Sequence, residues 1–84
     1  MLLSVSKFLR AIELDPDDQS THLSFALALE ATGQQKWAEE EYLRCCEIDP
    51  NYLPGLRHYS EYLRKTGRVM DAEQFESRAR AVTA

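Results

Sequence analysis

The sequence predicts an all-α fold of antiparallel helix-turn-helix repeats, and three observations support this prediction. The segment from Ala11 to Pro16 reappears 34 residues later as the segment from Cys45 to Pro50. Apolar residues between these segments recur with the period of a helix. Glycines or Asp-Pro pairs stand where each apolar stripe stops. A fixed internal period of this length indicates a stack of small repeated units.

The apolar stripes place five helices along the chain. They are expected near residues 2–14, 20–32, 36–48, 53–66 and 70–82. Gly33 and Gly67 favour the left-handed conformation that ends a helix. Pro16 and Pro50 end the helices before them, because the residue preceding a proline resists helical geometry. The chain thus contains two helix pairs, preceded by a single helix.

Each expected helix carries one stripe of apolar residues at helical spacing. In chain order the stripes are Phe8 and Ala11; Phe25, Ala26 and Leu29; Ala38, Tyr42 and Cys45; Leu56, Tyr59 and Leu63; and Ala72, Phe75, Ala79 and Val82. Trp37 is expected to pack across the turn between paired helices rather than to anchor a partner. The run from Glu39 to Glu41 is expected to form a solvated outer face, since carboxylates favour the first turn of a helix.

The order of these residues resembles the tetratricopeptide repeat family. The matching residues of the central unit are His22, Phe25, Ala26, Leu29, Ala38, Tyr42, Cys45 and Pro50, and those of the last unit are Leu56, Tyr59, Ser60, Leu63, Ala72 and Ala79. In the last unit Glu76 replaces an aromatic residue and Phe75 comes one place early, so a shifted or loosely packed last helix is expected. The resemblance implies a right-handed superhelix, or α-solenoid, as one domain (1–84), with a half repeat at 1–18 and full repeats at 19–52 and 53–84.

Length and charge exclude several classes of protein. The chain of 84 residues is too short for two independent cores, and its net charge of −4 disfavours a nucleic-acid-binding surface. No apolar run approaches the roughly 20 residues that a membrane-spanning helix needs, so we expect no membrane segment. Cys45 and Cys46 are adjacent, which is poor geometry for a disulfide, and a cytoplasmic location is expected.

Catalytic chemistry is not expected. The candidate parts are His22, His58, Cys45 and Cys46, and their spacing forms neither a nucleophile with a base nor a zinc site. His22 lies on the core stripe of its helix and Cys45 takes the place of a small packing residue, so packing is the preferred interpretation of both. We therefore expect no cofactor and no metal.

The family resemblance implies that the first helix of each pair lines a concave surface, which holds a peptide or a helix of another protein. The residues predicted for this partner-binding face are Leu23, Leu27, Arg57, His58, Glu61, Arg64, Lys65 and Arg68. Helical spacing stacks the last six as a mostly basic stripe, for which an acidic peptide or helix is the expected partner. A solvated charged face is the alternative interpretation.

A self-associating element is the second functional hypothesis. Helix 20–32 is apolar almost all round, because Leu23 and Leu27 lie away from its core stripe. The first helix of the leading repeat would cover this face. Without that helix, the uncovered apolar surface predicts a homo-oligomer. The residues of this surface are Leu2, Leu3, Val5, Leu9, Leu23 and Leu27.

Overall fold

The computed structural model describes the backbone of residues 2–84 and the side chains from Val5 onwards. Its helices are α1 (Leu2–Leu14), α2 (Gln19–Ala31), α3 (Gln35–Ile48), α4 (Leu53–Lys65) and α5 (Val69–Thr83), and no strand occurs within this part of the chain. The expected all-helical class is confirmed. Each helix begins and ends within one residue of its expected position.

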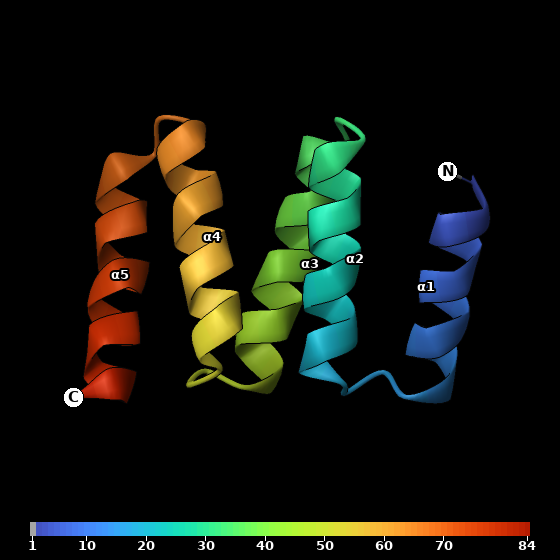
Figure 1. Cartoon of the computed structure of the whole chain (residues 1–84), viewed down its shortest axis with the longest axis horizontal. Coiled ribbons are helices and arrows are strands. Elements are labelled where there is room, and N and C mark those ends of the chain that lie inside the picture. Colours follow the sequence, from blue (N-terminus) through green and yellow to red (C-terminus); the bar gives the residue numbers. More distant parts are fainter. Residues whose placement is uncertain (1) are drawn as a thin grey trace.

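The helices run alternately up and down, with α1 and α5 at opposite ends of the molecule (Figure 1). α2 packs against α3 and α4 against α5, and α4 also contacts both helices of the first pair. The molecule measures 36 × 25 × 14 Å, so it is a flattened slab. Figure 1 shows α1 beside α2 at one end of this slab.

The turns within the two helix pairs have the same geometry. Gly33 and Gly67 both have φ +83°, the left-handed region that glycine adopts without strain. After each glycine the next amide reaches back across the helix end: Gln34 N donates to the Leu29 carbonyl at 2.9 Å. Arg68 N donates to the Leu63 carbonyl at the same 2.9 Å. The predicted glycine stops are confirmed.

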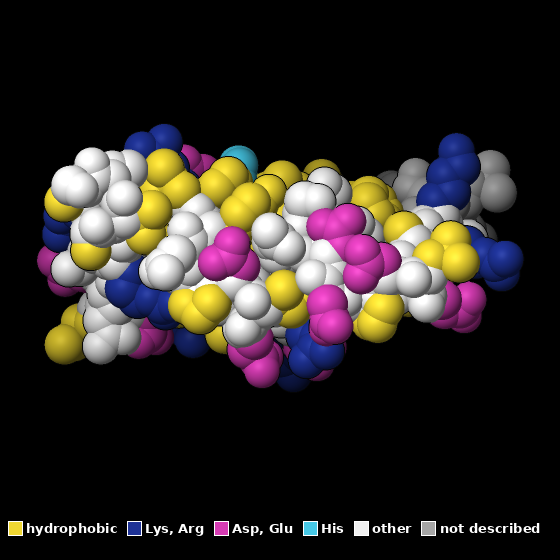
Figure 2. All heavy atoms as spheres, turned by 90° about the horizontal axis from the view of Figure 1, so that it is seen from below, with side chains coloured by type: hydrophobic (Ala, Val, Ile, Leu, Met, Phe, Trp, Pro, Cys, Tyr) yellow, Lys and Arg dark blue, Asp and Glu magenta, His cyan; other side chains and the backbone are white. Residues whose placement is uncertain are grey.

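The Asp-Pro turns between the helix pairs also repeat. Asp15 Oδ1 accepts from Asp17 N at 3.3 Å, and Asp49 Oδ1 accepts from Asn51 N at 3.0 Å. Asp18 then caps α2 by accepting from Ser20 N at 3.0 Å. Figure 2 looks onto the end of the molecule that carries both turns, and shows Asp and Glu side chains gathered there between hydrophobic ones. Among these carboxylates, Asp15 and Asp49 stabilise the turns and Asp18 caps α2.

The core repeats the same aromatic contact at an offset of 34 residues. Phe8 of α1 stacks on Phe25 of α2 with ring centroids 5.1 Å apart and an interplanar angle of 20°. Tyr42 of α3 stacks on Tyr59 of α4 at 5.4 Å and 19°. Corresponding residues of successive units therefore make corresponding contacts across the seam between units.

Two further rings complete the core on either side. Trp37 packs edge-on against Phe25 with centroids 5.2 Å apart, which confirms the packing interpretation of this tryptophan. Phe75 packs edge-on against Tyr59 at 4.7 Å. Ala72 and Ala79 of α5 are buried, so this helix packs closely at these positions, whereas Val82 of the expected stripe is 38% exposed and does not belong to the core. Phe75 supplies the missing aromatic contact from its displaced position.

The buried His22 and the two cysteines are packing residues. His22 Nε2 donates to the Pro16 carbonyl at 2.8 Å, and Nδ1 lies 2.6 Å from Glu41 Oε1, so one ring joins the α1–α2 turn to α3. Cys45 and Cys46 are buried free thiols, and burial raises the pKa of Cys45 to about 12. The packing interpretation of His22 and Cys45 is confirmed.

Candidate protein-binding groove

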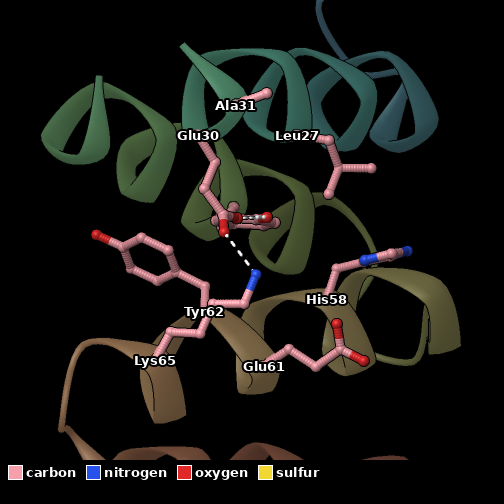
Figure 3. Close-up of a pocket in the computed structure, with 8 residues that line it drawn as sticks. Leu27, Glu30, Ala31, His58, Glu61, Tyr62 and Lys65 are labelled. Carbon is pink, nitrogen blue, oxygen red and sulfur yellow. Dashed lines mark hydrogen bonds and ion pairs between the residues drawn. The ribbon is translucent and has the colours of Figure 1, made fainter. Parts of the chain in front are cut away.

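A groove of about 370 Å³ lies between α2 and α4. Its lining residues are Leu27, Glu30 and Ala31 from α2, Tyr42 from α3, and His58, Glu61, Tyr62 and Lys65 from α4. Figure 3 shows the α2 residues on one side and the α4 residues on the other. The two helices that bound the groove are the first helices of the two pairs.

One carboxylate organises the polar contacts of the groove. Glu30 Oε2 lies 3.2 Å from Lys65 Nζ on the opposite wall, and this bridge crosses the groove in Figure 3. Glu30 Oε1 accepts from the Tyr42 hydroxyl at 2.6 Å. Burial and the nearby Glu30 raise the pKa of Tyr42, so its hydroxyl stays a donor at neutral pH. A buried tyrosine therefore fixes the carboxylate that Lys65 meets.

Half of the predicted partner-binding residues line this groove. They are Leu27, His58, Glu61 and Lys65, and Leu27 has 36% of its surface exposed. Leu23 does not, because it is only 6% exposed and belongs to the core. The expectation that Leu23 forms uncovered apolar surface is therefore wrong.

The predicted basic stripe is divided between two sides of α4. Arg64 binds both oxygens of Glu76 on α5, with Nε and a terminal nitrogen at 2.7 and 2.8 Å. Arg57 lines a separate hollow between α4 and α5. Arg68 follows α4 and pairs with Glu39 and with Asp71. His58, Glu61 and Lys65 thus line the groove, whereas Arg57, Arg64 and Arg68 contact other parts of the fold.

The acidic run at the start of α3 is mostly engaged in the fold. Glu39 accepts from the Tyr59 hydroxyl at 2.8 Å and pairs with Arg68. Glu41 faces His22 and has a side chain only 14% exposed. Glu40 alone of the three is exposed, so the expected solvated outer face is wrong for Glu39 and Glu41.

Sequence reasoning missed four residues that line the groove, namely Glu30, Ala31, Tyr42 and Tyr62. Glu30 and Ala31 follow Leu27 by three and four positions, which places them on the same helix face. That spacing was a usable signal. No sequence signal placed Tyr42 in the groove, because this residue reaches the groove floor from α3, a helix whose apolar stripe indicated only core packing.

The groove offers apolar and aromatic contacts beside groups of both charges. Within residues 5–84, no cluster of three or more His, Cys, Asp or Glu side chains has the arrangement of a metal site. No helix among the described segments is long and apolar enough to cross a bilayer.

Comparison of the chain with protein-family models and with curated proteins finds no match in either.

Proposed function

We propose that the chain is a tetratricopeptide-type segment, a right-handed superhelical α-solenoid, that acts as a non-catalytic scaffold for protein interaction. The repeated geometry supports this architecture. The stacked ring pairs at 5.1 and 5.4 Å and the two glycine stops are each related by 34 residues. A constant relation between successive units generates a superhelix.

The observation that carries the function is the groove between α2 and α4. In this architecture the first helices of successive pairs form the inner surface, and a peptide or helix of a partner lies along it. Leu27 and Ala31 supply an apolar wall next to the tyrosines of the floor. Tyr42 and Tyr62 are only 1% and 5% exposed and form the rigid floor, so Leu27, which is 36% exposed, is the proposed anchor.

The ion pair across the groove leaves room for a ligand. The Lys65 side chain is 69% exposed, and exposed ion pairs contribute only about 0 to 1 kcal/mol. An incoming peptide therefore displaces Lys65 from Glu30 at little cost. Glu30 and Glu61 then accept hydrogen bonds from donors of the ligand, and Lys65 donates to carboxylate or carbonyl oxygens of the ligand.

The test is selection from a displayed random peptide library, followed by titration of the selected peptides. Leu27→Asp places a charge on the groove wall, and Leu43→Asp places the same charge on α3, where Leu43 is 42% exposed. We expect Leu27→Asp to weaken binding at least about tenfold and Leu43→Asp to leave it unchanged. A library that yields no binder sensitive to Leu27→Asp contradicts the proposal.

Self-association is a second candidate function, favoured by apolar side chains on α1. Leu9 is 44% exposed and Leu14 75% exposed, whereas the side chains of Leu2 and Leu3 lie outside the described ones. Light scattering over a range of concentrations tests this: Leu9→Gln should lower the average mass if α1 forms the contact. A monomer at every concentration contradicts it.

A cytoplasmic location completes the proposal. The two buried thiols are free, and a reducing compartment keeps thiols in that form.

A further inference from the structure

The α4–α5 pair and the α2–α3 pair present corresponding faces of different chemistry. Residues 34 apart occupy corresponding places in the two pairs. On the first pair the face consists of Leu23, Ala26, Tyr42, Cys45 and Cys46, and the counterparts on the second pair are Arg57, Ser60, Glu76, Ala79 and Arg80. Three of the five places thus change from an apolar or aromatic residue to a charged one.

On the α2–α3 pair this face is covered by α4. The Tyr42 ring stacks on Tyr59 with centroids 5.4 Å apart. Gly55 of α4 lies so close to α3 that an added Cβ would meet Cys45 Sγ at 2.8 Å. All five residues of the face are buried. The face is therefore a binding site for one helix, which approaches closely at a small residue.

The corresponding face on the α4–α5 pair keeps the small centre of that site. Ser60 and Ala79 are buried, with 5% and 8% exposed. They line a hollow of about 220 Å³ between the two helices, together with Arg57, Glu76, Arg80 and Thr83. Small side chains at the centre leave space for the backbone of an approaching helix.

The rim of this hollow carries an excess of positive charge, with Arg57, Arg64 and Arg80 near the single Glu76 carboxylate. Arg64 holds both oxygens of Glu76, so that carboxylate is already neutralised, and its pKa is lowered by Arg64. Arg57 and Arg80 are exposed and form no ion pair with any side chain that the structure describes. Two guanidinium groups therefore face solvent at one site.

We propose that this end face, formed by Arg57, Ser60, Ala79 and Arg80, docks an acidic helix of a partner protein. The helix lies where α4 lies on the preceding pair, with small residues against Ser60 and Ala79. Its carboxylates pair with Arg57 and Arg80, since a guanidinium binds a carboxylate through two parallel hydrogen bonds. The end face is separate from the groove, which is lined by the other side of α4.

Fluorescence anisotropy with two synthetic amphipathic helical peptides tests the proposal. The first carries Glu along its polar face and Ala along the other, and the second has Lys in place of every Glu. The Arg57→Gln, Arg80→Gln double variant removes the two rim charges. The control is Lys36→Gln with Arg44→Gln, which removes the same charge from exposed positions of α3.

We expect the Glu peptide to bind and the Lys peptide not to bind. The Arg57, Arg80 double variant should bind the Glu peptide about tenfold more weakly. The control variant should bind it as the unsubstituted protein does. Added salt should weaken the binding of both the control variant and the unsubstituted protein. Equal weakening by the control variant would reduce the effect to general attraction and overturn the proposal. So would failure of the Glu peptide to bind. Self-association that the double variant abolishes would assign the end face to a second copy instead.

Discussion

The seam between α1 and α2 and the seam between α3 and α4 have the same geometry but different polar content. Both contain a stacked ring pair, at 5.1 and 5.4 Å. The α3–α4 seam uses tyrosines, whose hydroxyls donate to Glu30 and Glu39 at 2.6 and 2.8 Å. The α1–α2 seam uses Phe8 and Phe25, which carry no hydroxyl. One backbone repeat thus supports either an apolar junction or one tied by hydrogen bonds.

This difference indicates which of the two seams is the more stable. Tyr62 adds a second hydrogen bond across the central seam, beside that of Tyr59 to Glu39, because its hydroxyl donates to the Gln35 carbonyl at 3.2 Å. At the N-terminal seam a comparable hydrogen bond is made by His22, whose Nε2 donates to the Pro16 carbonyl at 2.8 Å. In a linear array the terminal unit also has one neighbour instead of two. We therefore expect α1 to open before α4.

The largest effect should come from truncating an aromatic residue at the central seam. Tyr42→Ala removes a ring that is 1% exposed and leaves Glu30 with Lys65 as its remaining partner, so the unfolding free energy should fall by about 3 to 5 kcal/mol. Phe8→Ala removes a half-buried ring and should cost less, with faster hydrogen exchange confined to α1. Urea denaturation and amide exchange measure both. Equal loss of protection in α4 with Phe8→Ala would break the comparison.

A close backbone approach at the central seam gives the next effect. Gly55→Ala places a Cβ 2.8 Å from Cys45 Sγ, and overpacking of this kind costs about 1 to 3 kcal/mol. Cys45→Ala removes that sulfur, so the double variant should recover part of the loss. A double-mutant cycle in urea measures the coupling. Strictly additive losses would show that the two residues are not in contact.

The helices followed from local signals in the sequence. Gly33 and Gly67 marked the helix ends because their φ requirement depends on neighbouring residues alone. Asp-Pro turns and apolar stripes act over similarly short distances, which explains why every boundary was predicted within one residue. The position of Phe75 led to the expectation of loose packing, but a ring one place early still reaches Tyr59.

The candidate site was only half predictable, because its key contacts join residues far apart. The pairs Glu30 with Lys65 and Glu39 with Arg68 span 35 and 29 residues, and no local pattern indicates them. Leu23 was misplaced for a related reason. A helical stripe identifies the face toward the paired helix, but the helices of neighbouring units bury further faces, as they bury Leu23 in the core.

A smaller effect should appear at alkaline pH and be specific to the central seam. Burial raises the pKa of Tyr42, Tyr59 and Tyr62 in the folded chain. Above about pH 10, where unfolded tyrosine ionises, the unfolded state binds fewer protons than the folded state, so stability falls as pH rises. Tyr42→Phe should cost about 0.5 to 1.5 kcal/mol at neutral pH and reduce this slope. Unfolding free energies from pH 8 to 11 test it, and an unchanged slope would contradict the assignment.

The smallest effect should come from Lys65, although its ion pair crosses the candidate groove. Its side chain is 69% exposed, so Lys65→Met should change the unfolding free energy by only about 0 to 1 kcal/mol. Glu30 keeps the Tyr42 hydroxyl as a donor after this change. Arg10→Met is the matched control, because the Arg10–Glu13 pair is exposed at both ends and lies on α1 alone. If Lys65→Met costs clearly more than Arg10→Met, the hydrogen bond and the ion pair at Glu30 strengthen each other. The groove would then be a rigid unit, and a peptide that displaces Lys65 would loosen the contact between α2 and α4.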